Sequence, residues 1–144
     1  MTWSLADISE KMRHIDFAML MTHAPDGALS GRPMSNNGEV EYSGDSFFFA
    51  DDSATMIEDI RRDPHVALSY AGSKGLLGKP PLFISIAGAA ELIKDTAAFA
   101  EHWTKDLERW WPQGVETPGL TLIKVRAERI HYWDGDEDGE IVVL

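Results

Sequence analysis

The tripeptide Arg32-Pro33-Met34 is the part of the sequence that most directly suggests chemistry. It lies in a stretch whose pattern predicts a strand, and a proline there removes one hydrogen-bond donor from the sheet. One interpretation is an edge strand with an exposed arginine. The other is a guanidinium aimed at a phosphate or an electron-rich ring, beside irregular backbone whose amides are open to a ligand.

Other patterns that would indicate catalysis or metal binding are weak. The five histidines, at positions 14, 23, 65, 102 and 131, do not form a helical pair at metal-ligand spacing, and cysteine is absent. Segment 72–79 looks like a phosphate-binding loop, but its glycine spacing is one residue too long and Pro80 stands where a serine or threonine should hold magnesium. We interpret it as a flexible loop. The sequence therefore predicts no catalytic residue and no metal site.

The overall charge restricts the classes of partner. The 144 residues include 13 Lys and Arg against 24 Asp and Glu, a formal charge of −11. A chain this acidic repels phosphate backbones and anionic lipids, which argues against nucleic acid and a membrane surface. No apolar stretch approaches the roughly 20 residues of a membrane helix, and the N-terminus lacks the layout of a signal peptide. The absence of cysteine favours a reducing, cytoplasmic location.

Short apolar or alternating runs, separated by turn residues, predict the strands. The turn signals are Pro25-Asp26-Gly27 and Ser43-Gly44-Asp45, and the second of them predicts a hairpin. Gly88, inside the longest run, predicts a bulge or a close backbone approach. The runs cover residues 17–22, 29–34, 39–42, 46–50, 65–70, 82–93 and 120–133.

Three segments have the signals of helices. The first has apolar residues at helical spacing over residues 5–12. The second ends at Asp63-Pro64, because the residue before a proline avoids helical conformations. The predicted N-caps are Ser4 for the first helix, Asp52 or Ser53 for the second and Asp95 or Thr96 for the third, which carries Phe99, Trp103 and Leu107.

These elements do not alternate as repeated strand–helix units, so a doubly wound parallel sheet is not expected. Roughly six antiparallel strands with two or three flanking helices predict a mainly β fold, a small barrel that closes to remove its edges. No linker or repeat divides residues 1–144, which predicts one domain. The acidic run from about Asp134 to Glu140 is interpreted as a solvated tail or turn.

Several motifs occur in an order that is typical of a known family. They are Arg32-Pro33-Met34, Phe47-Phe48-Phe49-Ala50, Ser53, Arg61-Arg62-Asp63-Pro64, Val66-Ala67-Leu68-Ser69-Tyr70, Ile84-Ser85-Ile86-Ala87-Gly88-Ala89-Ala90-Glu91, Trp103, Trp111-Pro112-Gln113-Gly114 and Tyr132-Trp133-Asp134. Together they resemble the general stress protein 26 family, which belongs to the pyridoxamine 5'-phosphate oxidase-like flavoproteins. Each motif is weak alone, and the resemblance rests on their shared order over about residues 8 to 135.

The resemblance implies a split β-barrel that forms a homodimer and holds FMN, or FAD, in two clefts at the subunit interface. Family members contact the flavin from two strands and from the start of the helix that follows the second. Trp110 and Trp111 are interpreted first as core or dimer-interface residues, with Trp111 also a candidate flavin contact. The candidate cofactor-binding residues are Arg32, Pro33, Met34, Ser35, Phe49, Ala50, Ser53, Thr55, Met56 and Trp111.

Two features depart from the family pattern. Relatives place a basic residue near the start of the helix after Ala50, where this chain has Ser53-Ala54-Thr55-Met56. Hydroxyls and helix-start amides bind a phosphate less strongly than a cation does, and Arg32, Lys74 and Lys79 are the candidate replacements. No basic residue follows Arg129, so the second phosphate pocket of a pyridoxamine phosphate oxidase is not expected.

The resulting hypothesis is a flavin-binding general stress protein whose FMN takes electrons from reduced nicotinamide and passes them to an unknown acceptor. In such a protein the flavin performs the chemistry, and no side chain needs to act as an acid or a base. Two alternatives stay open: a non-enzymatic flavin sensor or store, and an interaction module that binds no flavin. Pyridoxamine phosphate oxidation is less favoured than these.

Overall fold

The computed structural model describes residues 2–35, 41–73 and 76–143. Its helices are α1 (Leu5–Met12), α2 (Thr55–Arg62) and α3 (Thr96–His102), with the short 3-10 helices η1 (Leu76–Gly78), η2 (Lys105–Arg109) and η3 (Gly114–Glu116). Its strands are β1 (Phe17–His23), β2 (Leu29–Ser35), β3 (Asp45–Asp51), β4 (His65–Ala71), β5 (Phe83–Ile93), β6 (Leu120–Asp134) and β7 (Glu137–Val142). Within these ranges, none of the helices combines the length and the apolar character needed to cross a membrane.

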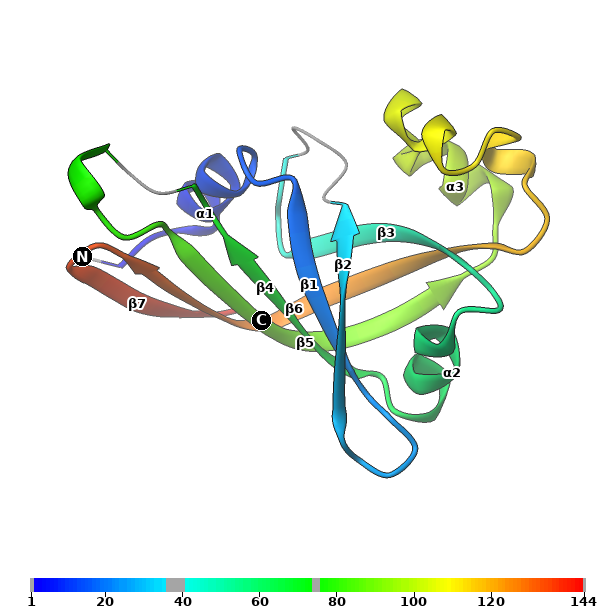
Figure 1. The fold of residues 1–144 in the computed structure, drawn as a ribbon, viewed down its shortest axis with the longest axis horizontal. Coiled ribbons are helices and arrows are strands. Elements are labelled where there is room, and N and C mark those ends of the chain that lie inside the picture. Colours follow the sequence, from blue (N-terminus) through cyan, green and yellow to red (C-terminus); the bar gives the residue numbers. More distant parts are fainter. Residues whose placement is uncertain (1, 36–40, 74–75, 144) are drawn as a thin grey trace.

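All seven strands belong to one antiparallel sheet in the order β2-β1-β4-β5-β6-β3, with β7 paired to β6 off this path. Figure 1 shows the long strands β5 and β6 curving along the molecule, with β7 at one end and α3 at the other. The described parts of β2 and β3 are not paired with each other, so the barrel is split between them. The mainly β split barrel with flanking helices is confirmed, with seven strands rather than about six.

Alternation along the strands builds the core. In β1, Ala18, Leu20 and Thr22 are buried, whereas Phe17 and Met19 face outward. A second, smaller apolar cluster joins α3 and η2 to the β3–β6 edge of the sheet. Its buried members are Phe49, Phe99, Leu107, Leu120 and Leu122. The aromatic residues of the segment from Phe99 to Trp111 are thereby fixed beside β3.

Several local predictions are confirmed. Ser4 and Asp7 form a capping box at the start of α1, because each side chain accepts a hydrogen bond from the other residue's backbone amide. Asp95 caps α3. The register of β5 on β6 shifts between Ala87 and Gly88, which is the bulge predicted from the glycine.

Around β3 the predictions were partly wrong. The predicted strand 39–42 lies in part outside the described residues, and Glu41 and Tyr42 belong to no strand. In the described structure, β3 pairs with β6 and not with a segment just before it, so the hairpin predicted at Ser43-Gly44-Asp45 is wrong. The turn residues there start a strand whose partner is far away in the sequence.

Two helix boundaries also differ from the prediction. The N-cap of α2 is Ala54, because the hydroxyl and the amide of Ser53 both bind the carboxylate of Asp51, at 2.6 and 2.8 Å. Asp52 is engaged by Lys94. The third helix ends at His102, since Trp103 has extended backbone, and Leu107 therefore lies on η2.

The acidic run near the C-terminus was predicted to be a solvated tail or turn, and this was only partly correct: residues 135 and 136 form a turn and most of the run is exposed, but the rest of it is not a tail. Residues 137–142 form β7, which pairs antiparallel with β6. Side chains of β6 reach the carboxylates of β7: Arg129 lies 2.8 Å from Glu140, and His131 lies 3.9 Å from Asp138. Cross-strand pairs of this kind stabilise the exposed face of β7, while Ile141 on its other face packs against the core.

Candidate functional site

A cavity of about 310 Å³ lies where the end of β2 meets β3 and the tryptophan segment after η2. We call it the aromatic cavity. Its lining includes five of the predicted cofactor-binding residues, Pro33, Met34, Ser35, Phe49 and Trp111. The other lining residues are Phe17, Phe48, Leu107 and Trp110. A cavity of this size with apolar walls and one hydroxyl is typical of a site for a flat organic ring.

The position of β2 explains Pro33. β2 is the first strand in the sheet order and pairs only with β1 among the described strands. Proline has no backbone N–H, and an edge strand tolerates this because one of its sides has no neighbouring strand to hydrogen-bond. The edge-strand interpretation of Arg32-Pro33-Met34 is therefore confirmed for the proline. Because the strand has no second neighbour, Pro33 and Ser35 are left to line the cavity.

Aromatic packing holds the opposite wall in place. The ring of Phe49 lies 5.0 Å from that of Trp103 and 6.3 Å from that of Trp111, in edge and tilted arrangements. Trp103 also contacts Trp111 edge to face at 6.3 Å. Trp110, by contrast, is 59% exposed and stands at the rim. The cavity thus has a fixed wall at Trp111 and an open edge at Trp110.

Arg32 does not line the aromatic cavity. Its Nη1 donates hydrogen bonds to the carbonyl of Leu20 at 3.1 Å and to Oγ1 of Thr22 at 2.8 Å, and its Nη2 lies 3.9 Å from the carboxylate of Asp59. Further hydrogen bonds go to Ser30. The guanidinium therefore completes a network inside this chain, between β1, β2 and α2, and is not free to receive a ligand.

Asp59 is the centre of that network and is 1% exposed. It accepts hydrogen bonds from Arg62 at 3.0 Å and from Thr22 at 2.9 Å. Burial by itself would raise the pKa of Asp59, but these hydrogen bonds and the attraction of both guanidiniums outweigh it, and the pKa is lowered. The carboxylate is therefore charged at neutral pH and bound to its partners.

The start of α2 does not offer the predicted phosphate site. Ser53 is bound to Asp51, Thr55 is exposed, and Ala50 and Met56 are packed in the core. The hydrogen bonds from Ser53 lower the pKa of Asp51, and those from Lys94 and then Thr121 lower the pKa of Asp52. Two carboxylates are therefore charged there, and Lys94 is already paired with one of them. A phosphate dianion does not fit beside these groups.

The remaining candidate cations, Lys74 and Lys79, do not supply a positive charge at this site. Lys74 lies outside the described residues, and Lys79 is exposed on the segment after η1 and lines none of the cavities described here. Around α2 itself, therefore, the described cations Arg61, Arg62 and Lys94 are all paired with carboxylates, and none is left for a phosphate.

A second cavity, of about 290 Å³, adjoins the aromatic cavity and shares Phe17, Ser35, Leu107 and Trp110 with it. We call it the arginine cavity. Its polar lining comes from the segment between α1 and β1 and from η2. The charged or titratable residues in it are Arg13, His14, Asp16, Asp106 and Arg109. None of them was among the predicted site residues, because nothing in their local pattern separates them from solvated surface residues.

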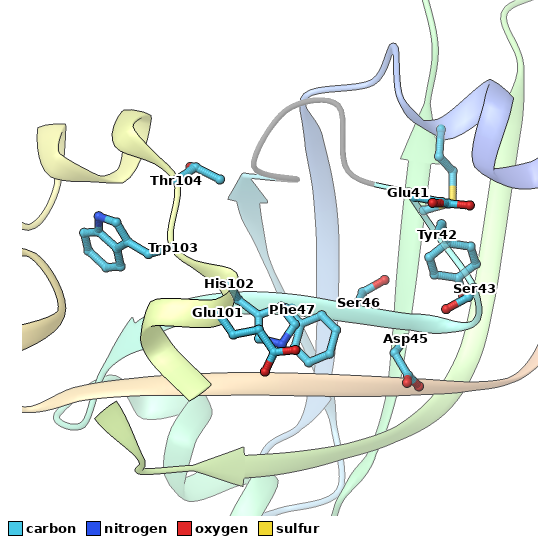
Figure 2. A pocket seen from close by; sticks show the side chains of 11 residues that line it. Glu41, Tyr42, Ser43, Asp45, Ser46, Phe47, Glu101, His102, Trp103 and Thr104 are labelled. Carbon is cyan, nitrogen blue, oxygen red and sulfur yellow. The ribbon is translucent and has the colours of Figure 1, made fainter. Parts of the chain in front are cut away.

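A third cavity, of about 420 Å³, is larger than these two and is lined by none of the predicted site residues. Figure 2 shows Glu41 and Tyr42 on one side of it and Glu101 and His102 on the other. The imidazole of His102 stacks on Phe47, with ring centroids 3.6 Å apart. Its carboxylates, which include Asp45, make it a poor place for an anionic ligand.

Comparisons with known proteins agree with the fold and with the resemblance. The family model described as "Pyridoxamine 5'-phosphate oxidase like" matches residues 4–144. A solved structure from Clostridium acetobutylicum, of a protein related to general stress protein 26 of B. subtilis, has a TM-score of 0.78 at 18% identity and covers 96% of this chain and 94% of that chain. General stress protein 26 from Bacillus anthracis has a TM-score of 0.75 at 20% identity, covering 96% and 98%.

A heme binding protein from Mycobacterium smegmatis also matches, with a TM-score of 0.77 at 15% identity. The match covers 99% of this chain but 59% of that protein. Identities this low show a shared fold and carry no residue roles across. A search among curated proteins found no significant match.

Proposed function

Because this chain belongs to the pyridoxamine 5'-phosphate oxidase-like family, we propose that it binds a flavin, FMN or FAD, in the aromatic cavity. The observation that carries the proposal is the convergence of Pro33, Met34, Phe49 and Trp111, which are distant in sequence, on one apolar cavity. The isoalloxazine ring is flat and largely apolar, and such a ring is best held between aromatic and aliphatic walls. A general stress protein with a flavin-dependent redox activity is the function that this site supports best.

The role of the chain in that function is binding and placement. A bound flavin supplies two-electron chemistry, taking a hydride from NADH or NADPH and passing the electron pair to an acceptor. Phe49 and Trp111 would hold the ring from one side, and Ser35 would contribute a polar group to the same lining. Since the cofactor carries the chemistry, the proposal needs no acid, base or nucleophile from the protein. We place this activity in the cytoplasm, in keeping with a chain that has no cysteine.

We expect Trp111→Ala to weaken FMN binding by about tenfold to a hundredfold, because a fixed aromatic wall is lost. The measurement is the dissociation constant of FMN from quenching of flavin fluorescence. Trp3→Ala is the matched control, since Trp3 stacks on Tyr132 with centroids 4.0 Å apart and lines neither the aromatic nor the arginine cavity. Equal affinity in the two variants would remove Trp111 from the site.

The ligand itself is identified from the purified protein. An absorbance spectrum, followed by mass analysis of what denaturation releases, is expected to show a flavin. A Soret band would instead favour heme, which the relative from Mycobacterium smegmatis is named for. A colourless protein that takes up neither FMN nor FAD would overturn the proposal and favour an interaction module.

Turnover is tested separately, because a flavin store would share the same cavity. Adding NADH or NADPH to the holoprotein without oxygen is expected to bleach the flavin on a catalytic timescale. If the yellow oxidised form persists with both donors, the protein binds flavin as a sensor or store.

We also propose that the protein is a homodimer whose second copy covers the outer face of the sheet. Phe17 and Met19 on β1 are 53% and 43% exposed, and Phe83 and Trp133, which are paired across β5 and β6, are 43% and 40% exposed. Large apolar groups spread over one face favour an interface. Since Phe17 also lines the aromatic cavity, a second copy on this face would narrow its mouth.

We expect Met19→Glu to weaken dimerisation by roughly a hundredfold, because it buries an unpaired charge in the interface. Sedimentation velocity over a concentration series measures the change. Leu77→Glu is the control, since Leu77 is fully exposed on η1, away from the sheet. A protein that sediments as a monomer before any substitution would contradict the proposal.

A further inference from the structure

We infer that Arg13 and Arg109, with His14, bind the phosphate of the flavin in the arginine cavity, in place of the start of α2. The inference rests on the proposed function and deepens it, because it assigns the anionic tail of the ligand to residues of this chain. The ligand class is an aromatic ring that carries a phosphate on a flexible chain.

Continuity of the two cavities is the first argument. The aromatic and arginine cavities have Phe17, Ser35, Leu107 and Trp110 in common, so they form one groove that is apolar at one end and charged at the other. The aromatic end would hold a ring. The charged end then lies where a substituent of that ring would emerge, and a phosphate needs guanidinium or imidazole donors there.

Arg13 supplies the second argument, because its side chain lines the arginine cavity and is 39% exposed. Its only ion pair among the described residues is with Glu10, at 3.8 Å, on an exposed surface where such a pair is weak. The terminal nitrogens of its guanidinium therefore have donors to offer a ligand oxygen in the cavity.

Arg109 and His14 complete the cationic set. Arg109 lies on η2, in no ion pair with any other described residue, and His14 follows Arg13 in the segment before β1. The cations therefore approach the groove from two separate segments. Two guanidiniums on a phosphate give charge-assisted hydrogen bonds, the strongest kind available to a protein.

Two carboxylates, Asp16 and Asp106, also line this cavity and weaken its attraction for an anion. Asp16 accepts a hydrogen bond from Ser35 at 3.4 Å, which ties it to the β2 side. At the start of α2, Lys94 is paired with the carboxylate of Asp52. In the arginine cavity, by contrast, the described arginines form no ion pair with Asp16 or Asp106. Asp106 gives the inference a test of opposite sign, since removing its charge should strengthen phosphate binding.

The experiment compares FMN with riboflavin, which has the same ring and chain but no phosphate. We expect FMN to bind wild type at least about tenfold more tightly than riboflavin. Arg109→Gln and Arg13→Gln should each lower this ratio by about tenfold and leave riboflavin binding unchanged. Asp106→Asn should raise the ratio, and Arg61→Gln, at an exposed arginine of α2 paired with Glu58, should not change it. FAD, whose phosphate is part of a pyrophosphate diester and lacks the free dianion of FMN, should lose less affinity than FMN in the Arg109→Gln variant.

The outcomes separate this inference from the proposed function. If riboflavin and FMN bind wild type equally well, the phosphate subsite is wrong while flavin binding stands. If neither binds, both are wrong. If Ser53→Ala lowers the ratio and both arginine variants leave it unchanged, the phosphate lies at the start of α2 and the inference is overturned. Arg109 is exposed, so its variant decides the matter even where Arg13→Gln does not fold.

Discussion

Gly88→Ala is expected to destabilise the protein by about 3 kcal/mol or more, because no space exists for a single added methyl group. A Cβ built at Gly88 would lie 2.1 Å from the backbone oxygen of Arg126 and 3.0 Å from its carbonyl carbon. Backbone cannot rotate away as a side chain can, so the bulge itself would have to open. That bulge lies within the pairing of β5 with β6, the two longest strands of the sheet.

The measurement is the free energy of unfolding from urea denaturation, with circular dichroism as the probe. Gly72→Ala is the matched control. A Cβ at Gly72 would meet atoms of Leu82 at 3.6 to 3.7 Å, which is ordinary contact. We expect its effect to stay within about 1 kcal/mol. A Gly88→Ala variant with the same denaturation midpoint as Gly72→Ala would show that the sheet tolerates the crowded bulge.

Gly88 also shows what the sequence alone could predict. A lone glycine inside a long apolar run has few explanations other than a bulge or a close approach, so the prediction needed only local information. The same holds for the N-cap at Ser4 and for the end of α2 before Pro64. Patterns that act over a few residues were sufficient for most of the strands and helices.

The strand β7 was missed because its stability depends on a partner. Its residues are rich in carboxylates, which locally favour a solvated segment. On β6, however, Arg129 and His131 reach diagonally across the strand pair to Glu140 and Asp138. The ion pair of Arg129 with Glu140 reduces the repulsion among the acidic residues, and no pattern within residues 134–140 reveals these partners.

For the candidate site, too, some features followed from the sequence and others depend on tertiary contacts. Pro33, Met34 and Phe49, which the resemblance assigns to one site, line one cavity, and their contact with a flavin stays a prediction. The predicted role of Arg32 as a ligand contact is not supported, because its partner Asp59 is contributed by α2. Only tertiary structure shows which of several arginines is already neutralised and which remains free.

Asp59→Asn is expected to lower the free energy of unfolding at pH 7 by about 2–3 kcal/mol. The substitution keeps the shape of the side chain but removes the charge that two guanidiniums face. An amide oxygen can still accept the hydrogen bond from Thr22, but the amide nitrogen would point toward a donor of Arg62 or Arg32. Because Arg32 is 21% exposed, leaving it without its carboxylate is costly.

The pH dependence separates this effect from a simple loss of packing. Folding lowers the pKa of Asp59 below the ordinary value of about 3.9, so the stability that its charge contributes is fully present above that value. The contribution is lost as the pH falls through the lower pKa of the folded state, where the wild-type carboxyl becomes protonated. The difference in unfolding free energy between wild type and Asp59→Asn should therefore be constant from pH 5 to 7 and shrink toward pH 2.

Asp63→Asn, at an exposed carboxylate bonded to His65, is expected to show a much smaller difference over the same range. A gap between wild type and Asp59→Asn that stays unchanged in acid would mean that shape, and not charge, is what Asp59 contributes.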